Sequence, residues 1–128
     1  MAMTYPTDLR YTNDHEWLKT GATCVVGITR FAVDQLGDIT LVDLPREGDL
    51  VTKGQRFGTI ESVKSVSDLY APVSGKVTKV NGALKDSPEL VNQDCYGAAW
   101  MIEIEPSDTG ELDELLSPEA YTALTAEH

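Results

Sequence analysis

Short runs of β-branched and aromatic residues, separated by Gly, Pro and Asn, make up most of the hydrophobic pattern of this chain. Such runs favour strands, and the residues between them favour turns. The pattern predicts strands at residues 16–19, 23–28, 39–44, 56–60, 66–70, 73–80 and 100–105. We therefore expect a mainly β core.

Two of these segments differ in the side chains they offer to the core. Ile102 and Ile104 alternate with Glu103 and Glu105, which is typical of a strand with one buried face. Residues 39–44 are apolar at both odd and even positions. A strand buried on both faces has this pattern, so we expect this strand at the centre of a sheet.

Helix signals are fewer and predict short, peripheral helices. Thr29 is a suitable N-cap for a helix that ends at Gly37, where glycine tolerates a left-handed conformation. Residues 111–116 predict one or two further helical turns.

A second capping signal lies near the end of the chain. Ser117 followed by Pro118 opens a C-terminal helix that reaches about Ala126. Tyr121 and Leu124 are three residues apart on this helix and would pack it against the core.

Composition limits the kinds of partner. With 128 residues and no linker, the chain is expected to form a single domain over residues 1–128. The formal net charge of −11 disfavours nucleic acid and anionic membranes as partners. The N-terminal residues carry neither a secretory nor an Arg-rich targeting signal. We therefore expect a bacterial cytoplasmic location, with a processed mitochondrial form as the alternative.

Several chemistries lack the residues they require. His15 is the only internal histidine, so a zinc-protease pair is absent, and no phosphate-binding loop, dinucleotide fingerprint or Gly-x-Ser-x-Gly elbow occurs. Cys24 lies in an apolar run and is expected in the core, whereas Cys95 is expected to be a loop thiol. The sequence thus predicts no catalytic residue and no metal site of its own.

The segment around Lys64 permits two structures. Residues 56–60 and 66–70 could be the arms of a hairpin with Lys64 at its tip. Ile60, Val63, Val66 and Leu69 recur every third residue, however, so the periodicity also allows a helix, and no Asn-Gly turn is present. The flanking glycines and Pro72 favour the hairpin. An exposed lysine at such a tip could enter the active site of a modifying enzyme.

At these residues the sequence resembles the glycine cleavage system H protein family. The lipoyl attachment site of that family is similar to Glu-Ser-Val-Lys at residues 61–64, followed by Ser67-Asp68 and by Ala-Pro-Val-Ser-Gly at 71–75. The resemblance covers almost the whole chain, with further matches at residues 15–17, 27–29, 36–38, 44–45, 88–92, 100, 115–116 and 119–121. Biotinyl domains typically place methionines beside the lysine, where this chain has Val63 and Ser65.

The resemblance implies a fold, a cofactor and partners. The expected fold is a barrel-sandwich hybrid of the lipoyl and biotinyl carrier type, with short peripheral helices and a C-terminal helix. Lys64 would carry lipoate through an amide bond, on an arm about 12 to 14 Å long. The chain would be a non-catalytic carrier of the aminomethyl intermediate of glycine. Its partners would be a pyridoxal-phosphate-dependent glycine decarboxylase, a tetrahydrofolate-dependent aminomethyltransferase, dihydrolipoyl dehydrogenase and the lipoate-attaching enzyme.

Three carboxylates have expected roles by the same resemblance. Glu16 and Asp68 could accept hydrogen bonds from the ammonium group of the loaded arm in a surface cleft, or they could be solvated surface groups. Glu61 could guide the lipoate-attaching enzyme to Lys64 by its charge, or it could only keep the hairpin soluble.

Other functions stay open on sequence grounds. A lipoyl carrier or relay that serves another multienzyme system has the same attachment site. An unmodified interaction domain would keep the fold without the cofactor. A small enzyme that acts through a Lys64 Schiff base is disfavoured, because that mechanism needs a desolvated lysine.

Overall fold

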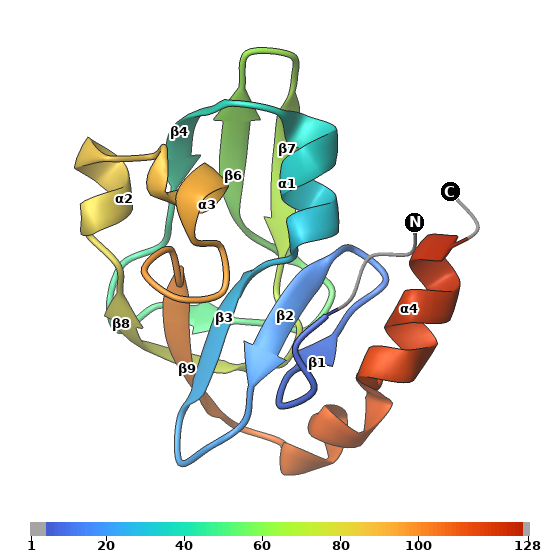
Figure 1. Cartoon of the computed structure of the whole chain (residues 1–128). Helices are drawn as coiled ribbons and strands as arrows, with labels where there is room; N and C mark the ends of the chain where they lie inside the picture. The colour runs from blue at the N-terminus through green and yellow to red at the C-terminus, as the bar shows by residue number, and fades with distance from the viewer. Residues whose placement is uncertain (1–4, 127–128) are drawn as a thin grey trace.

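The computed structural model describes residues 5–126, whose strands form two antiparallel sheets (Figure 1). The larger sheet has, in spatial order, β1 (Arg10–Tyr11), β2 (Glu16–Lys19), β3 (Cys24–Ile28), β9 (Ile102–Pro106), β8 (Gly75–Val80) and β5 (Leu50–Val51). The smaller sheet has the order β4 (Ile39–Asp43), β6 (Arg56–Ser62) and β7 (Val66–Tyr70).

The two sheets share one hydrophobic core. Val26 and Ile104 of the larger sheet and Ile60 and Leu69 of the smaller sheet are all buried in the same cluster. A second, mainly aromatic cluster joins the N-terminal segment to the C-terminal helix and contains Tyr5, Leu9, Tyr11, Trp17 and Tyr121. The mainly β, sandwich-like fold expected from the sequence is therefore confirmed.

The helices are short and lie outside the sheets (Figure 1). They are α1 (Arg30–Leu36), α2 (Ala83–Asp86), α3 (Leu90–Gln93), the 3-10 helix η1 (Thr109–Glu114) and α4 (Pro118–Ala126). The caps of α1 are those predicted, because the Thr29 side chain accepts the Ala32 N–H and Gly37 has a φ of 80°. Only α2, α3, β1 and β5 were not predicted, each too short to show a hydrophobic period.

One expectation from the sequence was wrong in detail. The strand β4 is an edge strand and not a central one, and its outward-facing Leu41 is 45% exposed. The apolar residues at odd and even positions of β4 therefore reflect one exposed hydrophobic side chain, Leu41, and not a strand buried on both faces. Cys95 does lie in a loop, but its side chain is buried, and burial raises the pKa of its thiol to about 11. Cys24 is in the core, as predicted.

Within the part of the chain that the structure describes, no helix combines the length and the apolar character needed to cross a membrane.

Candidate functional site

Lys64 lies at the tip of the hairpin formed by β6 and β7, which projects past the end of α1 (Figure 1). The N–H of Ser62 donates to the carbonyl of Ser65 at 2.9 Å and closes the turn. The Ser62 hydroxyl oxygen accepts the N–H groups of Lys64 and Ser65, each at 3.2 Å. The Ser62 side chain thus stabilises a turn that lacks the Asn-Gly pair typical of tight hairpins. The hairpin is confirmed, and the helical alternative is wrong.

The tip of the hairpin is held against the body of the protein. The N–H of Val63 donates to the carbonyl of Asp38 at 3.0 Å. Asn92 of α3 holds the segment between α1 and β4 that contains Asp38. Its side chain donates to the Gly37 carbonyl and accepts the Ile39 N–H, both at 2.9 Å. The tip that carries Lys64 therefore has a defined position relative to α1 and β4.

The Lys64 side chain is exposed and passes over a glycine. A Cβ placed on Gly37 would lie 3.2 Å from Cε and 3.7 Å from Nζ of Lys64. No other described residue forms an ion pair or a hydrogen bond with the Lys64 ammonium group. The amine is therefore accessible to a second protein.

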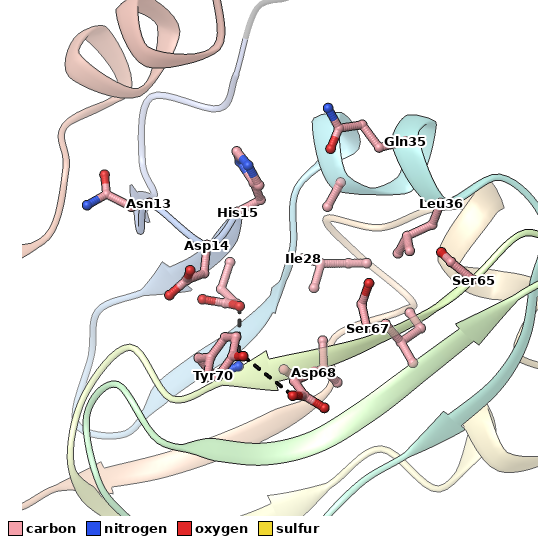
Figure 2. Close-up of a pocket in the computed structure, with 14 residues that line it drawn as sticks. Asn13, Asp14, His15, Ile28, Gln35, Leu36, Ser65, Ser67, Asp68 and Tyr70 are labelled. Atoms are coloured by element: carbon pink, nitrogen blue, oxygen red, sulfur yellow. Dashed lines mark hydrogen bonds between the residues drawn. The ribbon is translucent and has the colours of Figure 1, made fainter. Parts of the chain in front are cut away.

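A cleft of about 430 Å³ opens beside the hairpin, between α1 and β7. Figure 2 shows Leu36 of α1 and Ser67 of β7 on opposite walls of this cleft, with Ser65 near one end and Asp14 near the other. Five apolar side chains contribute to the lining, and they are Ile28, Ala32, Leu36, Ile60 and Leu69. The cleft begins next to Lys64, because Ser65 is one of its lining residues.

Glu16 is a buried carboxyl group in this cleft. Its residue is only 2% exposed, and it accepts hydrogen bonds from the Thr12 hydroxyl at 2.6 Å and from the Tyr70 N–H at 3.3 Å. Burial, with a smaller contribution from the charge of Asp14, raises the pKa of Glu16 to about 8, although the two hydrogen bonds oppose the shift. The alternative of a solvated surface carboxylate is therefore wrong for Glu16.

Asp68 also lines the cleft but keeps its contact with solvent. Its side chain is 43% exposed and lies 3.7 Å from the Arg56 guanidinium, and the Tyr70 hydroxyl donates to it at 3.4 Å. A surface ion pair of this kind contributes little to stability. The Asp68 carboxylate is therefore available to a ligand in the cleft.

Glu61 lies elsewhere. It pairs with Leu41 on one side and with Val66 on the other, and it is not one of the lining residues of the cleft. The structure thus brings Glu16 and Asp68 to one cleft, whereas Glu61 is not among the residues that line it.

Three functional contacts could not be found by reasoning from the sequence. His15 has a φ of 69°, and its Nδ1 lies 2.8 Å from the hydroxyl oxygen of Tyr121. Thr12 binds the carboxyl group of Glu16, and Asn92 holds the connection beneath the hairpin tip. From the sequence, His15 was considered as a zinc ligand, as a member of a catalytic triad and as part of a matched segment, and no local signal indicated these contacts. Among residues 5–126, no group of three or more His, Cys, Asp or Glu side chains could hold a metal ion.

Comparison with known proteins assigns the family. The sequence matches the family described as Glycine cleavage H-protein over residues 9–128. The chain belongs to this family. It is 53% identical over 125 residues to the glycine cleavage system H protein of Myxococcus xanthus, with 97% of each chain covered. It is 54% identical over 123 residues to that of Carboxydothermus hydrogenoformans, with 95% of each chain covered.

A solved structure confirms the fold of the family for this chain. A glycine cleavage system H protein from Mycobacterium marinum superposes with a TM-score of 0.88 at 41% identity, covering 95% of this chain and 99% of the other. Membership in the family supports a role as a lipoyl carrier in glycine cleavage. A carrier role agrees with a site that combines an exposed lysine and a cleft.

Proposed function

We propose that Lys64 carries lipoate in amide linkage and that the protein shuttles the aminomethyl intermediate of glycine between the enzymes of the glycine cleavage system. The observation that carries this proposal is an accessible lysine on an anchored hairpin tip, directly beside a cleft with a buried carboxyl group. Amide formation would remove the positive charge of the lysine and leave a neutral, largely apolar arm.

The dimensions and the chemistry of the cleft fit such an arm. At about 3.3 Å per residue, β7 extends about 13 Å from Val66 to Tyr70, which is comparable to an arm of about 12 to 14 Å. Ile28, Leu36 and Ile60 offer an apolar surface to the hydrocarbon chain and its ring. The N–H of Tyr70, at the far end of β7, contacts the Glu16 carboxyl group.

When bound, lipoate would supply the disulfide that takes up the aminomethyl group and that is later regenerated by oxidation. The residues of this chain would hold and shield that cargo. The proton of Glu16 would be released to an approaching ammonium group, because a nearby cation favours the ionised carboxylate. Asp68 would add a second acceptor at the solvent side, and the apolar wall would exclude water from the amine.

The partners in this proposal are a pyridoxal-phosphate-dependent glycine decarboxylase, a tetrahydrofolate-dependent aminomethyltransferase, dihydrolipoyl dehydrogenase and a lipoate-attaching enzyme. Tethering would raise the effective concentration of the cargo at each active site without a catalytic residue on the carrier. We further propose one lipoyl-carrier domain over residues 1–128 and a cytoplasmic location, the latter supported by relatives from bacteria.

The test is the intact mass of protein produced with lipoate available, followed by peptide mapping. We expect one lipoyl increment on Lys64 and none in Lys64→Arg. Lys76→Arg is the matched control, because Lys76 is an exposed lysine on strand β8. This variant should be modified like the wild type. A wild-type protein without the increment, or a Lys64→Arg variant that keeps it, would refute the proposal.

A further inference from the structure

Exposed hydrophobic side chains gather around the hairpin. Among the described residues, the large hydrophobic side chains that are exposed are Leu41 at 45%, Leu50 at 82%, Val63 at 68% and Val66 at 63%. Val63 and Val66 flank the tip, and Leu41 lies on β4 beside β6. Only Leu50, on β5 of the larger sheet, lies apart from the hairpin strands. An apolar group of this kind beside a modification site indicates an interaction surface.

The strand register places three residues side by side. Leu41 of β4 pairs with Glu61 of β6, and Glu61 pairs with Val66 of β7. Directly paired residues have their side chains on the same face of a sheet. We call Leu41, Glu61 and Val66 the outer row. The next position along each of β4 and β6 points the other way, since Val42 and Ile60 are buried in the core.

The outer row is acidic as well as apolar. The next row on the same face pairs Asp43 with Thr59 and Thr59 with Asp68. Asp68 is partly neutralised by Arg56, but neither Asp43 nor Glu61 forms an ion pair with any other described residue. A complementary surface would therefore have an apolar centre and basic side chains at its rim.

We propose that the outer row is the docking surface for the enzyme that joins the cofactor to Lys64. This inference rests on the proposed function. In the joining step the amine of Lys64 attacks the acyl carbon of an activated acyl donor. A C–N bond then forms, the activating group leaves with the electron pair of its bond to that carbon, and Nζ loses a proton to solvent or to a base of the enzyme.

The attaching enzyme must approach the protein more closely than the other enzymes that the carrier meets. The bare lysine side chain extends only about 6 Å from its Cα. The attaching enzyme must therefore contact the residues beside the tip, and the outer row places the exposed Leu41 and Val66 on either side of Glu61, three residues before Lys64. Enzymes that act on the loaded arm meet a reactive end about 12 to 14 Å from the protein, so they depend less on this surface.

The experiment measures lipoylation kinetics of the unmodified full-length protein with a purified lipoate-attaching enzyme, ATP and lipoate. The test variant is Leu41→Thr combined with Val66→Thr, since threonine keeps strand propensity while it replaces exposed apolar surface. Leu50→Thr is the matched control, because it changes an even more exposed hydrophobic residue on the other sheet. Glu61→Lys reverses the charge of the outer row without changing its apolar members. The unfolding midpoint of each variant confirms that it is folded.

We expect KM for the carrier to rise about tenfold in the double variant and in Glu61→Lys, with kcat little changed and with Leu50→Thr within about twofold of the wild type. The rate at which dihydrolipoyl dehydrogenase reduces the lipoyl disulfide of the variants with NADH, after prolonged lipoylation, should stay within about twofold of the wild type. Both results together support the inference.

Other outcomes overturn it. A wild-type KM in both outer-row variants shows that the surface does not dock the enzyme. An equal loss with dihydrolipoyl dehydrogenase assigns the surface to docking in general, and a wild-type dimer that the double variant dissociates assigns it to a second copy of this chain. If the wild type itself is not modified at Lys64, the proposed function fails as well, so the two failures are distinguishable.

Discussion

The phenol oxygen of Tyr121 lies 2.8 Å from Nδ1 of His15, and this contact joins the C-terminal helix α4 to the rim of the cleft. The same oxygen lies 2.7 Å from the hydroxyl of Thr29, which caps α1. Tyr121 itself is fully buried and stacks on Tyr11 with ring centroids 4.7 Å apart. One side chain therefore links α4 to the cleft and to the helix that forms the cleft wall.

Removing this hydroxyl should destabilise the fold. In Tyr121→Phe, the half-buried imidazole of His15 and the buried hydroxyl of Thr29 lose a hydrogen-bond partner, so we expect the free energy of unfolding to fall by about 1–2 kcal/mol. Urea denaturation at neutral pH measures the change. Tyr70→Phe is the control, since its hydroxyl contacts only the exposed Asp68 and should matter little. Equal effects in the two variants would contradict the role of Tyr121.

Asn92 should fix the base of the hairpin tip. Asn92→Ala leaves the Gly37 carbonyl and the Ile39 N–H without their partner, so we expect a loss of about 1–3 kcal/mol in unfolding free energy. The amide of Val63, bonded to the adjacent Asp38, should then exchange its hydrogen faster than in the wild type. Asn13→Ala replaces an exposed asparagine and provides the comparison. Unchanged exchange at Val63 would show that the tip does not depend on Asn92.

The carboxyl group of Glu16 should make stability depend on pH. Its pKa is about 8 in the folded protein, against about 4.3 in an unfolded chain. Between these values the folded protein holds a proton that the unfolded chain has released, so stability falls as pH rises through this window. The stabilising contribution is complete below the lower value and is lost once pH passes the upper one.

Glu16→Gln tests this dependence, because glutamine is isosteric and does not ionise. We expect the unfolding free energy of the variant, relative to that of the wild type, to rise by roughly 1 kcal/mol per pH unit between about pH 5 and about pH 8. Urea denaturation at a series of pH values measures this difference. Glu61→Gln removes one surface charge and is the control. Parallel pH profiles for wild type and Glu16→Gln would exclude a raised pKa at this position.

Gly37 should matter both for its backbone and for its contact with Lys64. Gly37→Ala introduces a Cβ at a φ of 80° and 3.2 Å from Lys64 Cε, so we expect a loss of about 1 kcal/mol in unfolding free energy and a displaced lysine side chain. Gly48→Ala is the matched control, since its φ is 93° and no atom lies within 4 Å of its Cβ. Lipoylation of Lys64 should slow in Gly37→Ala but not in Gly48→Ala. Equal rates would show that the contact with Lys64 has no consequence.

Local signals in the sequence were sufficient for several elements. The caps of α1 at Thr29 and Gly37, the proline that opens α4 and the alternating pattern of Ile102 and Ile104 all depend on residues a few positions apart. Such interactions act within one element, so the local sequence is enough to predict them. The hairpin at Lys64 carried no such local signal, because its turn is supported by the Ser62 hydroxyl and not by a residue pair typical of tight turns.

The sequence by itself thus determined a mainly β chain, its caps and its principal strands, and its resemblance to a family indicated Lys64 as the attachment point. Only the tertiary structure decided that β4 is an edge strand, that Glu16 is buried while Asp68 stays exposed, and that Glu61 shares a row with Leu41 and Val66. The physical reason is that these features depend on groups far apart in the sequence. Strand order, burial and the resulting pKa depend on groups that meet only after the chain has folded, such as Glu16 and the Tyr70 N–H, which are 54 residues apart.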